Sequence, residues 1–121
     1  MLRSLFNRGR VHQEEHGATM SVEELHHTLG LPEPLLVLDV RSPEEYAYDG
    51  HIVGSRLLPL PMLALRIDEL PRDRPIVCVC RSGHRSQVAC ELLSRQGFTQ
   101  AINLSGGMIA WRQAGLPMRT N

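Results

Sequence analysis

The sequence predicts an α/β domain in which helices cover both faces of a mostly parallel sheet. Short apolar runs that suit buried strands alternate with helix-like segments along the whole chain, which is typical of this fold class. The chain has 121 residues, of which 42% are hydrophobic and 21% are charged, enough for one domain around a single core. Because ligands of such sheets bind at the carboxyl ends of strands, the residues that follow each run are candidates for function.

The N-terminal part of the chain is polar. We expect residues 1–19 to form a flexible, basic extension and residues 20–121 to form the folded domain. The extension lacks the long apolar segment of a secretory signal. Its arginines resemble those of a mitochondrial targeting segment, but Glu14 and Glu15 end that resemblance, so a mobile extension is the preferred interpretation.

Capping signals mark the first two helices. Ser21 and Glu24 have the spacing of a capping box, which predicts a short helix that ends near residue 28. Ser42 and Glu45 repeat this signal, so a second brief helix is expected to begin directly after Ser42.

Apolar runs mark the strands, and further helices lie between them. The predicted strands are residues 35–38, 55–60, 76–80 and 101–104. Of these, 55–60 is an edge strand, because Pro59 has no N–H group to donate. The remaining helices are expected at residues 62–70, 86–95 and 108–114.

Residues 80–86, Cys-Arg-Ser-Gly-His-Arg-Ser, are the most informative segment of the chain. They place a cysteine between the end of a predicted strand and a predicted helix, for which Ser86 is the expected N-cap. Backbone N–H groups and the positive end of the helix dipole would then point at the sulfur atom. Such surroundings favour thiolate over thiol and hold an anion beside it, so Cys80 is predicted to be reactive.

Four groups of residues stand in a characteristic order. They are Leu-Asp-Val-Arg at 38–41 with Pro-Glu-Glu-Tyr at 43–46, Gly-His-Ile-Val-Gly-Ser at 50–55, the cysteine loop at 80–86, and Leu-Ser-Gly-Gly-Met-Ile-Ala-Trp at 104–111 with Ala-Gly-Leu-Pro at 114–117. On these residues the chain resembles the single-domain rhodaneses, a family of sulfurtransferases, from about Ser21 to Met118. The resemblance implies a doubly wound rhodanese-like fold with a central sheet of about five strands.

The resemblance also implies a persulfide mechanism without a cofactor. Cys80 would attack the outer sulfur of a donor such as thiosulfate and become a cysteine persulfide. A thiophilic acceptor, which is cyanide, a low-molecular-weight thiol or a protein thiol, would then take that sulfur. Ping-pong kinetics are expected, because the two substrates react in separate half-reactions.

The rest of the loop is expected to bind the anionic substrate through Arg81, Ser82, Gly83, His84, Arg85 and Ser86. Its backbone N–H groups would cradle the outer sulfur much as an oxyanion hole holds oxygen. Arg85 is favoured as an anion contact, whereas Arg81 is either an anion contact or an ordinary surface arginine. Gly83 is expected to have a positive φ, and His84 either assists proton transfer or faces solvent.

Several residues outside the loop are expected to have structural roles. The resemblance suggests that Asp39 and Arg41 support the loop through charge-assisted hydrogen bonds. His51 is expected to be a structural histidine. Cys78 is either a core residue or a thiol that resolves the persulfide, and strand geometry favours the core. Cys90 is expected to pack in the core.

Two other functions compete with sulfur transfer by turnover. Cysteine phosphatases also place a thiolate in a loop before a helix, but their loop is one residue longer than the interval from Cys80 to Arg85. The shorter interval predicts a cradle that fits sulfur better than a phosphoryl group. The second alternative is a rhodanese-like module that relays sulfur or binds a partner with little free turnover.

Composition limits the binding partners and the cellular compartment that the sequence predicts. Thirteen basic residues balance thirteen acidic ones, so no overall charge favours nucleic acid or an acidic membrane. The six histidines lack cysteine or carboxylate partners at zinc-like spacing, so no metal site is predicted. The three cysteines form no disulfide pattern, which favours a reducing, cytoplasmic setting. We expect a monomer or weak dimer.

Overall fold

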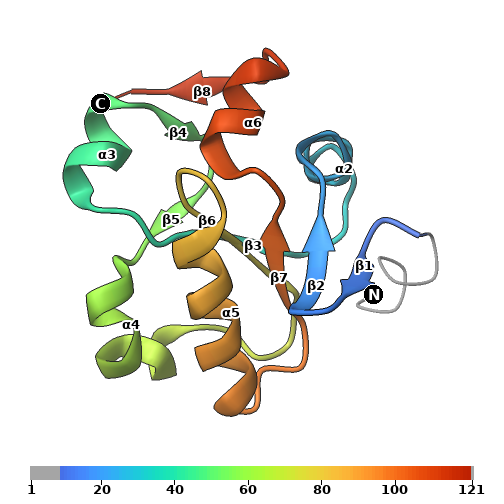
Figure 1. Cartoon of the computed structure of the whole chain (residues 1–121), viewed down its shortest axis with the longest axis vertical. Helices are drawn as coiled ribbons and strands as arrows, with labels where there is room; N and C mark the ends of the chain where they lie inside the picture. The colour runs from blue at the N-terminus through green and yellow to red at the C-terminus, as the bar shows by residue number, and fades with distance from the viewer. Residues whose placement is uncertain (1–8, 121) are drawn as a thin grey trace.

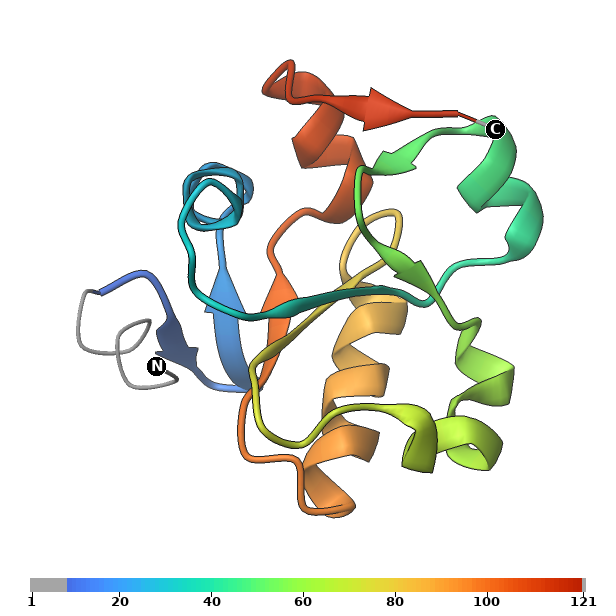
Figure 2. The ribbon, with the colours of Figure 1, turned by 180° about the vertical axis from the view of Figure 1, so that it is seen from behind.

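The computed structural model describes residues 9–120, which form a mixed sheet with helices on both faces (Figure 1, Figure 2). The strands of this part of the chain are β1 (His12–Glu14), β2 (Gly17–Met20), β3 (Leu36–Asp39), β4 (His51–Ile52), β5 (Arg56–Leu57), β6 (Ile76–Val79), β7 (Ala101–Leu104) and β8 (Met118–Arg119). The helices are α2 (Val22–Leu29), α3 (Pro43–Tyr48), α4 (Leu60–Arg66), the 3₁₀ segment η1 (Ile67–Glu69), α5 (His84–Arg95) and α6 (Gly107–Gln113). None of these helices is long and apolar enough to span a membrane.

The main sheet has six strands in the order β1-β2-β7-β6-β3-β5. β1 and β2 pair in antiparallel fashion, and the other pairs of this sheet are parallel. β6 lies in the middle, with Cys78 opposite Leu38 of β3 and Asn103 of β7. The short strands β4 and β8 form a separate pair. The predicted α/β class and mostly parallel sheet are confirmed, and the sheet has one strand more than the expected five.

Alternate side chains of β6 face the two helical layers. Val77 and Val79 pack in the core that includes residues of α2 and α6. Ile76, Cys78 and Cys80 face the opposite core, which includes residues of α4 and α5. The cysteine that ends the strand therefore lies on the side of the sheet that α5 covers.

Residues 12–19, which the sequence predicts to lie in a flexible extension, are part of the sheet together with Met20. They form the hairpin β1–β2, and β2 pairs in parallel with β7, with Met20 opposite Leu104. Met20 is fully buried, and its carbonyl accepts a hydrogen bond from Ser105 N–H. No apolar run in the sequence indicates this edge of the sheet. The reason is that β1 is exposed and β2 is held mainly by backbone hydrogen bonds. Residues 1–8 of the predicted extension lie outside the described residues.

Both capping boxes start helices where the sequence predicts them. The Ser21 hydroxyl accepts a hydrogen bond from Glu24 N–H at 3.0 Å, and the Glu24 carboxylate accepts one from Ser21 N–H at 2.8 Å. Ser42 and Glu45 make the same reciprocal bonds at the start of α3. These local signals fix the two helix starts without help from distant packing.

Candidate active site

Cys80 directly follows β6, a central strand with parallel partners on both sides. The loop after it turns back into α5 and passes close to the start of α6 (Figure 1). Only 1% of Cys80 is exposed to solvent. The thiol is therefore enclosed by the loop, and the atoms of the loop determine its chemistry.

The loop directs hydrogen-bond donors at the sulfur atom. The backbone nitrogen of Gly83 lies 3.1 Å from Cys80 Sγ, and that of Ser86 lies 3.3 Å from it. The Ser86 hydroxyl oxygen is also 3.3 Å from Sγ. The φ angle of Gly83 is 110°, a value that glycine adopts without strain, so its predicted role in the turn is confirmed.

These donors lower the pKa of the Cys80 thiol. Burial raises this pKa, because the thiolate loses its solvation. The hydrogen bond between Sγ and the Ser86 hydroxyl, and those from the backbone N–H groups of Ser86, Gly83 and Ser82, act in the opposite direction and outweigh burial. The pKa therefore lies below the ordinary value of a cysteine, which favours the nucleophilic thiolate.

Helix α5 begins two residues earlier than the sequence predicts. It starts at His84, with Gly83 in the N-cap position and no side-chain cap. Ser86 is therefore not the N-cap; it is a fully buried residue of the first helical turn. An N–H group in the first turn has no partner within the helix, so the Ser86 N–H can donate to Cys80 Sγ.

The start of α6 holds the outer side of the loop. Met108 N–H donates to the Cys80 carbonyl at 2.9 Å, and Ile109 N–H donates to the Arg81 carbonyl at 3.0 Å. A Cβ atom at Gly107 would lie 2.4 Å from the Cys80 carbonyl oxygen, so this approach requires glycine. The contact was not predicted, although the paired glycines at 106–107 are a signal for it in the sequence.

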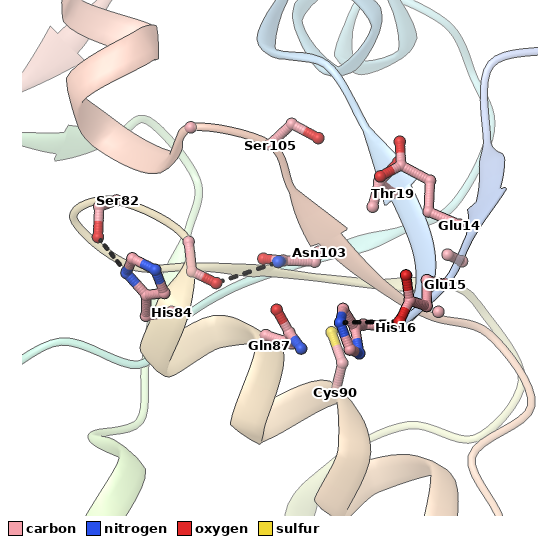
Figure 3. Close-up of a pocket in the computed structure, with 14 residues that line it drawn as sticks. Glu14, Glu15, His16, Thr19, Ser82, His84, Gln87, Cys90, Asn103 and Ser105 are labelled. Atoms are coloured by element: carbon pink, nitrogen blue, oxygen red, sulfur yellow. Dashed lines mark hydrogen bonds and ion pairs between the residues drawn. The ribbon is translucent and has the colours of Figure 1, made fainter.

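Asn103 of β7 is a second unpredicted member of the site. Its Oδ1 accepts a hydrogen bond from the Ser86 hydroxyl at 2.6 Å, and its Nδ2 donates to the Gly83 carbonyl at 3.1 Å (Figure 3). The amide thus joins the two residues that contact the sulfur of Cys80. Its signal in the sequence is a polar residue within an otherwise apolar strand.

Arg85 forms a bidentate ion pair with Glu45, with nitrogen–oxygen distances of 2.7 and 2.8 Å. The hydrogen bond from Arg85 lowers the pKa of Glu45 to about 2, and the same bond raises the pKa of Arg85. Because Glu45 also completes the capping box of α3, the pair ties the start of α5 to α3. The arginine expected as an anion contact is thus held by a carboxylate, with 40% of its side chain exposed.

The other side chains of the loop lie at the surface. The Ser82 hydroxyl and His84 Nδ1 are 3.2 Å apart (Figure 3). Arg81 lines a small surface pocket of about 30 Å³ together with Arg112 of α6 and the buried Arg41. Three arginines and Asp49 therefore line a pocket on one side of the cysteine loop.

The residues expected to support the site form two buried groups. Arg41 Nη2 lies 2.8 Å from Asp39 Oδ2, with side-chain exposures of 2% and 1%, and it also donates to the Gly50 carbonyl. His51 is buried and stacks on Tyr46, whose carbonyl oxygen lies 2.8 Å from His51 Nδ1. These contacts fit structural roles for Asp39, Arg41 and His51.

The comparison with known proteins agrees with this geometry. Residues 21–114 match the model of the rhodanese-like domain. The chain belongs to this family. A sulfurtransferase of Allochromatium vinosum is 43% identical over 96 residues, which cover 79% of this chain and 89% of that protein. The thiosulfate sulfurtransferase GlpE of Stutzerimonas stutzeri is 39% identical over 77 residues, which cover 64% of this chain and 70% of that protein.

The fold of this rhodanese domain also has a close match among solved structures. A rhodanese-related protein from Thermoplasma volcanium superimposes with a TM-score of 0.78 at 29% identity, over 85% of this chain and 98% of its own. The resemblance noted in the sequence is confirmed. Together, the two named sulfurtransferases and the family match support a sulfurtransferase role for the rhodanese domain.

The two other cysteines of the rhodanese domain lie in its core. Cys78 is fully buried, and Cys90 is 8% exposed. A hydrogen bond with Cys90, together with burial, raises the pKa of Cys78 well above its ordinary value. Core packing is thus confirmed for both residues, and Cys78 lacks the thiolate character that a resolving thiol needs.

Two cavities flank the cysteine loop within the described chain. One, of about 430 Å³, lies between the hairpin β1–β2 and the turn at residues 82–84, and it reaches Asn103 and Cys90 (Figure 3). The other, of about 340 Å³, is lined by Arg85 and by residues 40–43 and 59–61. Among residues 9–120, no group of three or more His, Cys, Asp or Glu side chains could hold a metal ion.

Proposed function

We propose that this rhodanese domain transfers a sulfane sulfur from thiosulfate, or from another persulfide donor, to cyanide or a thiol. The observation that carries the proposal is the set of contacts on Cys80 Sγ, from the N–H groups of Gly83 and Ser86 and from the Ser86 hydroxyl. Cys80 is a buried thiol with a lowered pKa. These properties support its role as a nucleophile that is anionic both as the free thiolate and as the persulfide.

The first half-reaction forms a persulfide. The Cys80 thiolate attacks the outer sulfur of thiosulfate, a new S–S bond forms, and the old S–S bond breaks with its electron pair leaving on sulfite. The negative charge then lies on the outer sulfur of the persulfide. Backbone N–H groups of residues 81–86 would stabilise this charge, as fixed donors stabilise an oxyanion.

The second half-reaction removes the sulfur. Cyanide, or the thiolate of an acceptor, attacks the outer sulfur, and the electron pair of the S–S bond returns to Cys80 Sγ. The products are thiocyanate, or an acceptor persulfide, and the free Cys80 thiolate. The proposal requires no cofactor, because the covalent intermediate on Cys80 carries the sulfur.

The loop side chains have proposed roles in binding the anionic substrate. Arg81, which shares a pocket with Arg112, would supply positive charge beside the cradle. Arg85 gives two N–H groups to Glu45 and has further N–H groups for an anion. Ser82 and His84 would contact the substrate from the exposed rim of the loop.

The alternative within the same chemistry is a sulfur relay. In that role the donor is a protein persulfide and the acceptor is a protein thiol, in a reducing cytoplasmic setting, and turnover with cyanide is low. The proposal includes a monomer or weak dimer that has neither nucleic-acid nor membrane partners. A phosphatase is the weaker alternative, because four residues between Cys80 and Arg85 form a loop that is short for a phosphoryl group.

Steady-state release of thiocyanate from thiosulfate and cyanide tests the proposal. We expect parallel lines in double-reciprocal plots for the wild-type protein and no release for Cys80→Ser. Persulfide formation without thiocyanate release, followed by sulfur transfer to a protein thiol, would identify the relay. Hydrolysis of an aryl phosphate, or thiocyanate release by Cys80→Ser, would contradict the proposal.

A further inference from the structure

The Ser86 hydroxyl stands between two acceptors but has only one proton. Its oxygen lies 3.3 Å from Cys80 Sγ and 2.6 Å from Asn103 Oδ1. A hydroxyl group donates one hydrogen bond and can accept others. When the proton of Ser86 points at Asn103, Cys80 Sγ faces lone pairs of the same oxygen instead of a donor.

The orientation of the Asn103 amide is fixed by its second contact. Its Nδ2 is 3.1 Å from the Gly83 carbonyl oxygen, which can only accept a hydrogen bond. The nitrogen must therefore face Gly83, as Figure 3 shows, and Oδ1 must face Ser86. Oδ1 is an acceptor, and among the described residues its donor is Ser86.

The thiol and the thiolate of Cys80 place opposite demands on this proton. In the thiol state, Cys80 S–H donates to Ser86 Oγ, Ser86 donates to Asn103, and each contact has one donor and one acceptor. In the thiolate state, the proton of Cys80 has left for solvent, and Sγ is best stabilised if Ser86 turns its proton toward it. Asn103 Oδ1 then loses its donor, which costs free energy in a partly buried position.

We propose that Asn103 is a positioning residue that tunes the reactivity of Cys80 by competing with its sulfur for the Ser86 proton. The proposal rests on Cys80 as the nucleophile of the proposed function, and it concerns the free thiol rather than sulfur transfer itself. In the persulfide the charge lies on the outer sulfur, so Ser86 can keep its proton on Asn103. The competition therefore destabilises the free thiolate of Cys80 more than it destabilises the persulfide.

Substitution of Asn103 leaves the other ionisable groups near Cys80 unchanged. The elements packed around it contribute Asp39 of β3 and Arg41 just after it, and Cys78 of β6. The loop contributes Arg81 and His84, and α5 contributes Arg85 and Cys90, with Glu45 of α3 paired to Arg85. A shift in reactivity on substitution of Asn103 alone therefore reports the hydroxyl proton rather than a new charge nearby, except where the substitution itself adds a charge.

Two substitutions of Asn103 separate this competition from a loosened loop. Asn103→Ala removes the fixed acceptor, and a water molecule in its place could donate as well as accept, so the Ser86 proton becomes available to sulfur. Asn103→Asp keeps an acceptor and adds a negative charge. Both variants lose the bond from Nδ2 to the Gly83 carbonyl, so a merely structural effect would move both in the same direction.

The measurement is the pH profile of Cys80 alkylation by iodoacetamide, with the labelled cysteine identified by peptide mass spectrometry. We expect the midpoint to fall by about one pH unit in Asn103→Ala, the size of one hydrogen bond to a charged group, and to rise in Asn103→Asp. In a Ser86→Ala background, Asn103→Ala should produce no downward shift.

Three results would overturn the proposal. One is a shift of the Ala and Asp variants in the same direction, another is an unchanged midpoint in Asn103→Ala, and the third is a downward shift that persists with Ser86→Ala. Circular dichroism establishes that each variant is folded, and if Asn103→Asp is not, the comparison of Asn103→Ala with and without Ser86→Ala decides. Because alkylation needs no sulfur donor, these results are independent of whether the protein turns over thiosulfate.

Discussion

Cys78 and Cys80 lie two residues apart on the same side of the sheet, and at most 1% of either residue is exposed. Their thiols nevertheless have opposite properties. The pKa of Cys78 is raised by its hydrogen bond with Cys90 and by burial, whereas donors from the loop lower the pKa of Cys80 despite its burial. The comparison teaches that burial does not decide whether a cysteine is reactive. The hydrogen-bonding groups that surround the sulfur atom, here the Ser86 hydroxyl and backbone N–H groups, decide it.

The donors around Cys80 depend on three elements at once. The positive φ of Gly83 turns the loop, and the first turn of α5 supplies the N–H group of Ser86. The start of α6 binds the Cys80 and Arg81 carbonyls from the other side. Cys78 lies within the ladder of β6, where its neighbours use their N–H groups to pair strands. A donor shell of this kind is therefore available only past the strand end.

The largest expected effect comes from removing one thiol or the other. Cys80→Ser should reduce sulfur transfer by at least about 10³-fold, because the hydroxyl is not ionised near neutral pH. Cys78→Ala should retain persulfide formation and lose about 1 kcal/mol of stability from the small cavity it leaves. Thiocyanate assays and urea unfolding of both variants measure these effects. Loss of transfer in a folded Cys78→Ala protein would break the comparison.

The second prediction concerns a substitution that disturbs the hydrogen-bond donors around Cys80 through the backbone at the start of α6. Gly107→Ala places a Cβ atom 2.4 Å from the Cys80 carbonyl oxygen and should cost about 2–4 kcal/mol, with slower alkylation of Cys80. The matched control is Gly115→Ala, which has a similar positive φ of 71° but no atom within 4 Å of the added Cβ. It should cost only about 1 kcal/mol for its backbone conformation. Equal losses of unfolding free energy would mean that close approach to the loop is unimportant.

The third prediction separates the contribution of the Arg85 charge to anion binding from that of the backbone N–H donors. Arg85→Ala removes a guanidinium group near the loop and leaves the N–H groups on Cys80 Sγ in place. The apparent KM for thiosulfate should rise by about 3- to 10-fold, with a smaller change in kcat. Steady-state kinetics of this variant beside Glu45→Gln test the point, since the latter weakens the pair but keeps the arginine. Unchanged kinetics in Arg85→Ala would assign anion binding to the backbone alone.

The smallest expected effect is the acid dependence of the pair between Arg85 and Glu45. The pKa of Glu45 is about 2 in the folded protein and near its ordinary value of 4.5 in the unfolded chain, so the folded state favours the carboxylate. The stabilisation is complete above pH 4.5 and is lost as the pH falls toward 2. It should amount to less than about 1 kcal/mol, because both side chains are partly exposed. Urea unfolding from pH 6 to pH 2 should show a shallower loss in Glu45→Gln; identical profiles would exclude this contribution.

The parts of the molecule that were predicted from the sequence have local signals. Capping boxes at Ser21 and Ser42 fix two helix starts, and apolar runs mark β3, β6 and β7. The loop at 80–86 has its cysteine, glycine and polar residues within one short segment, so its place after a strand could be read directly.

The parts that were not predicted depend on contacts between distant segments. Asn103 reaches Ser86 across 17 residues only because β7 pairs with β6 in one register. The contact of Gly107 with Cys80 depends on how α6 packs against the loop. The hairpin β1–β2 is held by a ladder to β7, which leaves little apolar pattern in its own residues. Helix α5 begins at His84, two residues before the predicted start, because Gly83 takes the N-cap position without a side-chain cap.

The measurement that tests the central claim most directly is mass spectrometry of the reduced protein after it is mixed with thiosulfate. We expect a gain of one sulfur atom, located on the peptide that contains Cys80 and absent from Cys78 and Cys90. Cyanide should then remove this sulfur and release thiocyanate. Sulfur on Cys78 or Cys90, or an equal gain in Cys80→Ser, would contradict the claim that the donor shell at the end of β6 makes Cys80 the reactive thiol.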